Sequence, residues 1–384
     1  MAVVQHSLIE AIGEVSFVLR SLQFERLFLV LDEPAYEASG ARDVLERLFQ
    51  QRATARFTDF ELNPKLQDVQ RGISAYRECQ PDLMIALGGG TAIDLAKLIG
   101  TLAVQSGSAR DIATARASIE VAGKPLMAIP TTAGTGSEAT HFAVVYVDGE
   151  KYSVAHPSLL PRYAVVDWTL TESLPKRVTA ATGLDAFCQA IESMWAVGAT
   201  EESMGYATEA ARLAFSNLVT ATTSPTPKAR EAMSRASHLA GKAINISKTT
   251  APHALSYALT SRHGVPHGMA VAIMLAPMLV FNAAVTDEDC TDPRGPVAVR
   301  DRIARILDIL GTNNVGDATT SITSLLSKVD CPTALDAVGV ETSDELTSIV
   351  DSVNVERLAN NPRRTSQNQL FNLLQGIQRN TSTK

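Results

Sequence analysis

The chain has 384 residues, of which 45% are hydrophobic and 20% are charged. This balance is typical of a folded protein of two or three domains and excludes a disordered or fibrous chain. A formal net charge of −7 argues against a broad basic surface for nucleic acid or an anionic membrane, so we expect small-molecule partners.

The cysteines and the apolar segments bear on the cellular compartment. The four cysteines are widely spaced and form no CxxC pair, which predicts reduced packing residues rather than disulfides or a thiolate zinc site. The sequence shows neither a signal-like N-terminus nor the ~18 consecutive apolar residues that a membrane span needs. We therefore expect a cytoplasmic protein.

Short apolar runs alternate with amphipathic stretches through the first part of the chain. Buried strands are predicted at 27–31, 82–87, 126–129 and 164–167. After the second strand, the apolar residues of 92–99 have helical spacing. Strands that alternate with helices predict an α/β domain with a mostly parallel sheet that is covered on both faces.

The pattern changes to helical periodicity from about Pro175 onward. Segments that are mostly rich in Ala and Leu predict helices at 180–196, 202–221, 228–246 and 299–310. We therefore expect an all-helical second domain. Ligands of such two-domain enzymes usually bind in the cleft between the halves, near the carboxyl ends of the strands.

Two small-residue loops directly follow predicted strands. Gly88, Gly89, Gly90 and Thr91 lie where a strand meets a helix, so peptide N–H groups can point at an anion that approaches closely. A second loop, 130–138, is rich in hydroxyl groups. Its hydroxyl residues are Thr131, Thr132, Thr135 and Ser137. A tight turn explains one such loop equally well, but two loops at one sheet edge favour a dinucleotide.

Acidic residues near these loops have two interpretations. Asp32 comes just after the first strand, where a carboxylate can bind the ribose hydroxyls of NAD and repel the extra phosphate of NADP. It is equally well explained as a turn residue. Asp94 and Lys97, in the helix after the glycines, are either exposed polar positions or residues that reach toward the cofactor.

A group of histidines and polar residues predicts a metal site in the second half. His253, His263 and His267 fall within fifteen residues, and Asp185 and Gln189 share one helix face because four residues separate them. Oxygen donors from one helix and imidazoles from another can hold a divalent metal with an open position. Read alone, Asp185 and Gln189 are better explained as an ordinary polar helix pair.

These motifs resemble those of the iron-containing (group III) alcohol dehydrogenases, and the resemblance covers nearly the whole chain. It rests on the segments 88–97, 130–138, 179–186 and 263–268. The family combines a nicotinamide-dinucleotide-binding α/β domain with an all-helical domain and holds a divalent metal between them. The resemblance therefore implies a cofactor domain at 1–174, a metal-binding domain at 175–384, and interconversion of alcohols and aldehydes.

The resemblance also implies a ligand set of one Asp and three His. Asp185, His253 and His267 match three of these positions, but Gln189 stands where the family has its first His. A Gln carbonyl is a harder and weaker donor, so we expect Gln189 to coordinate and Fe(II), or another ion that accepts oxygen ligands, to be held less tightly. Tyr257 stands where many members of the family have a His, so a proton-relay role assigned to that His is lost or altered here.

Residues around the metal motif suggest the substrate. Lys248, Thr249 and Thr250 form a compact donor cluster ahead of His253, as an anionic substrate group requires, and Arg262 can add charge. A solvated loop is the alternative. His263 is a candidate catalytic proton donor through a water chain, and Lys248 a second catalytic candidate.

The lysine segment and Gln189 resemble the phosphonoacetaldehyde reductase branch of the family, which makes 2-hydroxyethylphosphonate in phosphonate biosynthesis. We therefore expect reduction of a small anionic aldehyde with NAD(H), and with NADP(H) as the alternative cofactor. The rival interpretations are a general short-chain alcohol dehydrogenase and a lyase or cyclase related to dehydroquinate synthase. The family also suggests a homodimer or larger homo-oligomer.

Overall fold

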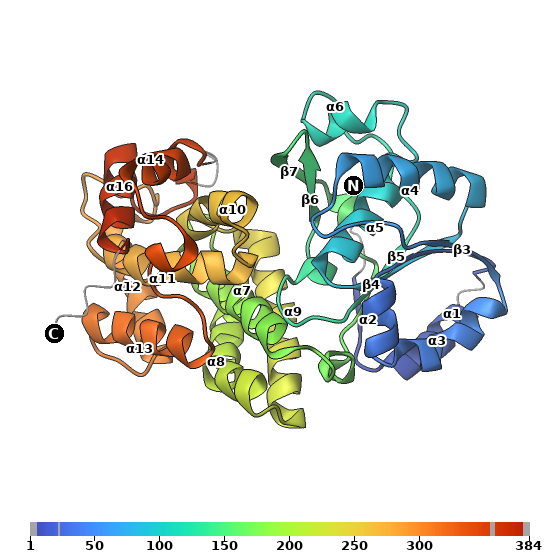
Figure 1. Ribbon diagram of the computed structural model, residues 1–384, viewed down its shortest axis with the longest axis horizontal. Helices are drawn as coiled ribbons and strands as arrows, with labels where there is room; N and C mark the ends of the chain where they lie inside the picture. The colour runs from blue at the N-terminus through green and yellow to red at the C-terminus, as the bar shows by residue number, and fades with distance from the viewer. Residues whose placement is uncertain (1–5, 22–23, 354–357, 379–384) are drawn as a thin grey trace. The chain divides into compact units, whose positions relative to one another are not determined.

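The computed structural model describes residues 6–21, 24–353 and 358–378. Contacts within the chain divide it into two compact units, Met1–Leu174 and Pro175–Lys384, which we call the N-terminal and C-terminal units. Figure 1 shows strands confined to the first unit and helices throughout the second. Each unit is described by itself.

A six-stranded sheet organises the N-terminal unit, with the strand order β1-β8-β5-β4-β2-β3 and parallel pairing throughout. Its strands are β1 (Ser7–Ile9), β2 (Arg26–Leu31), β3 (Ala53–Phe57), β4 (Leu83–Gly88), β5 (Leu126–Pro130) and β8 (Tyr163–Val165). The strands β6 (Phe142–Val147) and β7 (Glu150–Ala155) form a separate antiparallel hairpin.

Helices cover both faces of this sheet (Figure 1). They are α1 (Val15–Ser21), α2 (Glu33–Ala38), α3 (Ala41–Gln50), α4 (Leu66–Cys79), α5 (Gly90–Leu102) and α6 (Ala109–Ala113). In β2, Leu27 and Leu29 pack with α1, α2 and α3, whereas Phe28 and Val30 pack with α4 and α5. Every residue of β4 is buried, as expected for a parallel strand between two helical layers. The predicted α/β fold is confirmed.

The strand order reverses beside β2. From β2 the chain runs outward to β3 and then returns to β4 on the other side of β2. Parallel α/β sheets bind ligands at such a reversal, outside the carboxyl ends of the strands. Asp32 follows β2 and Gly89 follows β4, so both lie at this point.

The C-terminal unit is all-helical, as predicted. Its helices are α7 (Lys176–Trp195), α8 (Glu201–Thr223), α9 (Pro227–Ser247), α10 (Ala251–His263), α11 (His267–Ala283), α12 (Gly295–Ile309), α13 (Val315–Lys328), α14 (Ser343–Asp351) and α16 (Gln367–Gly376). Helix α7 packs against α8, α9 and α11, and α11 also packs against α10. Within the described ranges, no helix combines the length and apolar character needed to cross a bilayer.

Helices α7 and α11 approach each other closely at Gly268. A Cβ atom on Gly268 would overlap the Ala181 carbonyl oxygen and would lie 2.8 Å from the Asp185 backbone nitrogen. The missing side chain therefore allows the start of α11 to rest on α7.

Gly268→Ala is expected to lower the free energy of unfolding by ~1–3 kcal/mol, because the methyl group forces α11 away from α7. Urea unfolding measures this change. Gly205→Ala in α8 is the matched control, because a Cβ there meets no atom within 4 Å. This control is expected to gain ~0.5–1 kcal/mol, and unchanged stability of Gly268→Ala would refute the close approach.

Candidate functional site

The carboxyl end of β4 forms a turn that only glycine fits. Gly88 has a φ of +145°, and a Cβ there would lie 2.8 Å from the Asp32 Cβ and 2.9 Å from the Ala92 Cβ. In the described residues no side chain caps α5, which begins directly after Gly89. The first N–H groups of α5, including that of Thr91, therefore remain available to an anion, the arrangement that binds phosphate in dinucleotide sites.

The loop after β5 lies against this glycine turn. The Thr131 N–H donates to the Gly88 carbonyl over 3.0 Å, and a Cβ on Gly90 would lie within 2.8 Å of Thr135. Thr132 contacts the Cβ position of Gly89 at 3.5 Å. The Thr131 hydroxyl is buried and has no hydrogen-bond partner in the part of the chain described. The structure thus brings the two predicted loops together, and an uncapped helix with an unsatisfied hydroxyl fits a pyrophosphate.

Asp32 caps a helix beside the glycine turn. Its Oδ1 accepts a hydrogen bond of 3.1 Å from the Ala35 N–H at the start of α2. The side chain is half-buried and contacts the Cβ position of Gly88. The turn role that we considered for Asp32 is therefore present. Its place at the strand reversal is also where a ribose-binding carboxylate belongs.

Asp94 and Ser137, predicted as cofactor contacts, instead bind each other. The Ser137 hydroxyl donates to Asp94 Oδ1, and the Val144 N–H donates to Oδ2 over 2.9 Å. Burial raises the pKa of Asp94. Since both carboxylate oxygens are engaged within the protein, Asp94 supports the loop after β5 rather than the cofactor itself.

Lys97 completes this buried network rather than reaching toward the cofactor. Its ammonium donates to Thr140 Oγ1 over 3.0 Å and to the Phe142 carbonyl over 2.8 Å, and it lies 3.9 Å from Asp94 Oδ1. The buried carboxylate of Glu138 also attracts the Lys97 ammonium electrostatically, which favours its charged form. Burial lowers the pKa of Lys97 from 10.5 to about 8. The network ties α5 to the segment that carries the second loop.

A candidate metal centre lies in the C-terminal unit. Asp185 from α7, His253 from α10 and His267 from α11 each offer a ligand atom, and these atoms lie within 4.8 Å of one another. His253 Nε2 is 3.3 Å from Asp185 Oδ1, close to the ~3.4 Å between two ligands of one tetrahedral ion. Asp185 Oδ1 is buried and accepts no hydrogen bond from the described residues. The donor set therefore fits a divalent cation.

Gln189 lies one helical turn after Asp185, as its spacing predicts. Its amide nitrogen donates to Asp185 Oδ2 over 3.1 Å, and the side chain is buried. This hydrogen bond orients the Asp185 carboxylate. It uses only the amide nitrogen of Gln189, whereas a Gln coordinates a metal through its oxygen. Its coordination of the metal stays a prediction.

Glu192 is a site residue that sequence reasoning missed. Its fully buried carboxylate accepts hydrogen bonds from His253 Nδ1, from the Thr250 N–H over 2.7 Å and from the Thr250 hydroxyl over 2.9 Å. The signal was its position seven residues after Asp185, two turns along the same helix face. Burial lowers the pKa of His253, but Glu192 and Asp185 outweigh this and raise it to about 9.

Thr250 serves this network rather than a substrate. Its hydroxyl donates to Glu192 and accepts a hydrogen bond of 2.8 Å from Trp195 Nε1. The hydroxyl is fully buried between these partners, so the predicted substrate contact of Thr250 is not supported. Thr249 is also buried, and its carbonyl accepts from Asn360 Nδ2 over 3.0 Å.

Lys248 occupies a strained turn between α9 and α10. Its φ of +61° is unusual for a residue other than glycine, and its side chain is exposed. Asn360 holds the turn by donating to the carbonyls of Ser247 and Thr249 over 2.8 and 3.0 Å. Strain that is held in place this way is common at binding sites. The turn presents an ammonium group two residues before Thr250.

His263, predicted as a catalytic proton donor, and Arg262, predicted to add charge for the substrate, lie at the far end of α10 from His253. Ten residues separate His263 from His253 along α10, a rise of about 15 Å. The guanidinium of Arg262 donates hydrogen bonds to the backbone carbonyl of Ser348 in α14, over 3.1 Å, and to the Ser348 hydroxyl. We therefore do not retain His263 as the proton donor or Arg262 as a substrate contact. Tyr257 instead stacks on His267, with ring centroids 6.1 Å apart.

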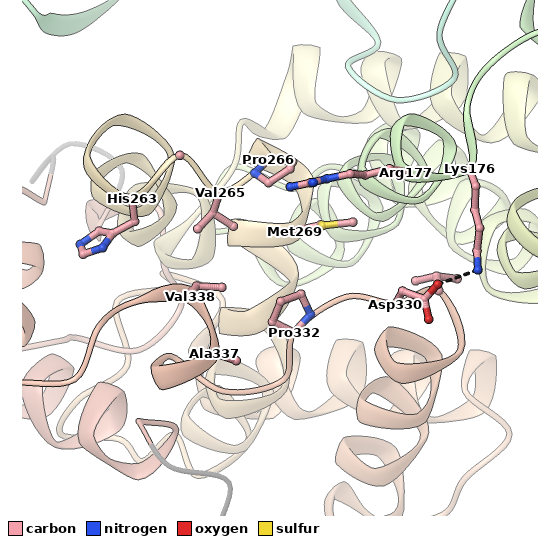
Figure 2. Close-up of a pocket in the computed structure, with 12 residues that line it drawn as sticks. Lys176, Arg177, His263, Val265, Pro266, Met269, Asp330, Pro332, Ala337 and Val338 are labelled. Carbon is pink, nitrogen blue, oxygen red and sulfur yellow. Dashed lines mark hydrogen bonds and ion pairs between the residues drawn. The ribbon is translucent and has the colours of Figure 1, made fainter.

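His263 lines a separate cavity of about 620 Å³ in the C-terminal unit. Figure 2 shows His263 at one end of it and the ion pair of Lys176 with Asp330 at the other. The ammonium and carboxylate of that pair are 2.6 Å apart. None of the candidate metal ligands lines this cavity, so it is distinct from the metal centre.

Comparison with known protein families matches both units. The model of the iron-containing alcohol dehydrogenases matches residues 6–168, and the model of the C-terminal region of that Fe-containing family matches residues 179–377.

Known relatives match most of the chain. Phosphonoacetaldehyde reductase of Streptomyces viridochromogenes is 36% identical over 310 residues, which cover 78% of this chain and 76% of that protein. Long-chain-alcohol dehydrogenase 1 of Geobacillus thermodenitrificans is 35% identical over 291 residues, covering 74% and 70%. The crystal structure of sulfoacetaldehyde reductase from Bifidobacterium kashiwanohense in complex with NAD+ aligns with a TM-score of 0.86 and 27% identity, covering 99% and 98%.

Lys97→Met is expected to destabilise the protein by ~3–5 kcal/mol at pH 7, because Asp94 and Glu138 lose their buried counter-charge. Chemical unfolding measures the change, and Lys124→Met on the surface is the control.

The stability change also depends on pH. The pKa of Lys97 is about 8 in the folded protein and 10.5 in the unfolded chain, so the unfolded chain binds more protons between these two pH values. The pH-dependent part of the stability that Lys97 contributes is complete above pH 10.5, where the lysine is neutral in both the folded and the unfolded chain, and is lost as the pH falls through 8. The deficit of Lys97→Met should therefore widen from pH 8 to 10.5, and a narrowing deficit would contradict the assignment.

Gln189→His is expected to tighten binding of Zn(II) or Fe(II) roughly tenfold, about 1.4 kcal/mol, because imidazole is a stronger donor than a carboxamide. Competition with a chromophoric chelator measures the affinity. Gln189→Leu removes the donor and should weaken binding. If Gln189→Leu binds metal as tightly as the wild type, Gln189 is not a ligand.

Proposed function

Because the chain belongs to the iron-containing alcohol dehydrogenase family, we propose that it reduces a small anionic aldehyde, phosphonoacetaldehyde, to the primary alcohol 2-hydroxyethylphosphonate. The family assigns the reaction class, an oxidoreductase of alcohols and aldehydes that uses a nicotinamide cofactor and a divalent metal. The further step to one substrate is supported by the turn at Lys248 and by the relatives.

We propose that Asp185, His253, His267 and the Gln189 carbonyl hold the metal. In the N-terminal unit, the glycine turn of 88–90 and the loop of 131–135 hold the cofactor pyrophosphate. When bound, a divalent metal polarises a carbonyl and a reduced nicotinamide supplies hydride. A carboxylate at Asp32 favours NAD(H), since it pairs with ribose hydroxyls and repels a 2′-phosphate. The NAD+ complex of the Bifidobacterium enzyme is consistent with this choice.

The single observation that carries the substrate proposal is the exposed ammonium of Lys248 on a strained, clamped turn. Thr250, two residues further along the chain, contacts Glu192, which in turn contacts His253. An exposed ammonium group on the turn that leads into the metal-binding helix α10 suits a two-carbon aldehyde with a phosphonate at its other end. The Lys248 charge then orients the substrate, and no proton transfer is assigned to it.

The relatives favour the same substrate class. The names of two of them describe acetaldehyde bearing an oxyanion group, a phosphonate in one and a sulfonate in the other. A relative of nearly equal identity is a long-chain-alcohol dehydrogenase, so an uncharged alcohol or aldehyde is the alternative substrate. An uncharged substrate has no anionic group for Lys248 to bind.

Lys248→Ala is expected to lower kcat/KM for phosphonoacetaldehyde about 10- to 100-fold, as the loss of a hydrogen bond to a charged group costs ~1.5–3 kcal/mol. The same variant should leave kcat/KM for propanal unchanged. Oxidation of NADH, followed by its absorbance, measures both reactions in metal-reconstituted enzyme.

Lys248→Arg retains the charge and should recover part of the activity, whereas Lys228→Ala, an exposed lysine of α9, controls for net charge. Equal efficiency of the wild type with phosphonoacetaldehyde and propanal would exclude the anionic substrate. Substrate turnover without any net change in NADH would instead indicate the lyase class.

A further inference from the structure

Glu192 is a carboxylate with no exposure to solvent, which is costly unless hydrogen bonds and positive charge offset it. It lies on α7 two turns after Asp185, and both side chains face His253. One oxygen, Oε1, is occupied by His253 Nδ1. The other, Oε2, accepts both donors of Thr250. The carboxylate is therefore held in one orientation.

Trp195 determines the direction of the Thr250 hydrogen bond. The indole N–H can only donate, and it donates to Thr250 Oγ1 over 2.8 Å. The hydroxyl proton of Thr250 is therefore directed at Glu192 Oε2. This chain of donors keeps Glu192 an acceptor on both oxygens.

His253 is consequently restricted to one tautomer for metal binding. Because Glu192 accepts at Nδ1, that nitrogen carries the proton, and in the neutral ring the lone pair lies on Nε2. Nε2 is the atom that faces Asp185 Oδ1 at 3.3 Å, where the candidate metal would lie. A carboxylate on the second nitrogen of a metal-binding His also increases its donor strength.

We propose that Glu192 is a positioning residue that presents the Nε2 lone pair of His253 to a divalent cation and compensates for the weak donor Gln189. Asp185 and Glu192 together carry the two negative charges that balance a divalent ion, since Gln189 and the neutral imidazoles carry none. This inference rests on the metal-dependent function proposed above.

The test is the affinity of the full-length apoenzyme for Zn(II), measured by chelator competition without aldehyde or nicotinamide. Glu192→Gln keeps the shape of the side chain, but its amide N–H donates to His253 Nδ1 and forces the ring proton onto Nε2. Binding is expected to weaken about 10- to 100-fold, as for other partners of metal-binding histidines. Glu201→Gln, at an exposed position of α8, is the matched control and should bind Zn(II) as the wild type does.

Glu192→Asp provides the second variant, because it retains the charge but shortens the reach toward His253. Its affinity should fall between those of the wild type and Glu192→Gln. Thermal unfolding of the apoenzymes separates folding from binding: a merely structural role lowers the melting temperature and leaves the Zn(II) affinity unchanged. Unchanged affinity in Glu192→Gln, or in Glu192→Asp should the first variant not fold, overturns the proposal. Failure to reduce phosphonoacetaldehyde bears only on the function, because no substrate enters this experiment.

Discussion

Two carboxylates buried on one face of α7 impose the main constraint on the C-terminal unit. Asp185 and Glu192 cannot lie in the interior without positive or hydrogen-bonding partners, and the beginning of α10 provides them through His253 and Thr250. Gly268 lets α11 approach the same helix, which places His267 beside Asp185. The contacts among these three helices and the donor set for a cation are therefore consequences of the same packing.

The candidate anion site of the N-terminal unit depends on backbone geometry rather than on buried carboxylates. The reversal of strand order puts the ends of β2 and β4 side by side, and β5 pairs with β4. Glycines then bring the backbone of the turn against Asp32 and the threonines of the second loop. Behind this edge, Lys97 and Asp94 join α5 to the following segment. The turn therefore offers peptide N–H groups to the anion that we propose it holds.

Much of this arrangement could be predicted from the sequence, and each feature that could not has its own physical reason. Runs such as 27–31 and 82–87 carry the apolar pattern of buried strands, and Asp185 with Gln189 carries the spacing of one helix face. Helix α11 was not predicted because it is apolar on all sides and lacks periodicity. The partners of Asp94, Thr250 and Glu192 depend on which elements become neighbours, and spacing along the chain does not contain that information. His263 was grouped with His253 because the two are close in sequence, but a helix extends that interval to about 15 Å.

The cap that Asp32 provides for α2 links its proposed role in cofactor choice to folding. Exchanging this carboxylate for a small apolar residue, the simplest way to make room for a 2′-phosphate, also removes the acceptor for the Ala35 N–H. Loss of such an acceptor typically costs ~0.5–2 kcal/mol. Asparagine or serine keeps an oxygen for the helix while discarding the negative charge. A redesign for NADP(H) at this position therefore has a narrow set of usable side chains, restricted by the helix rather than by the nucleotide.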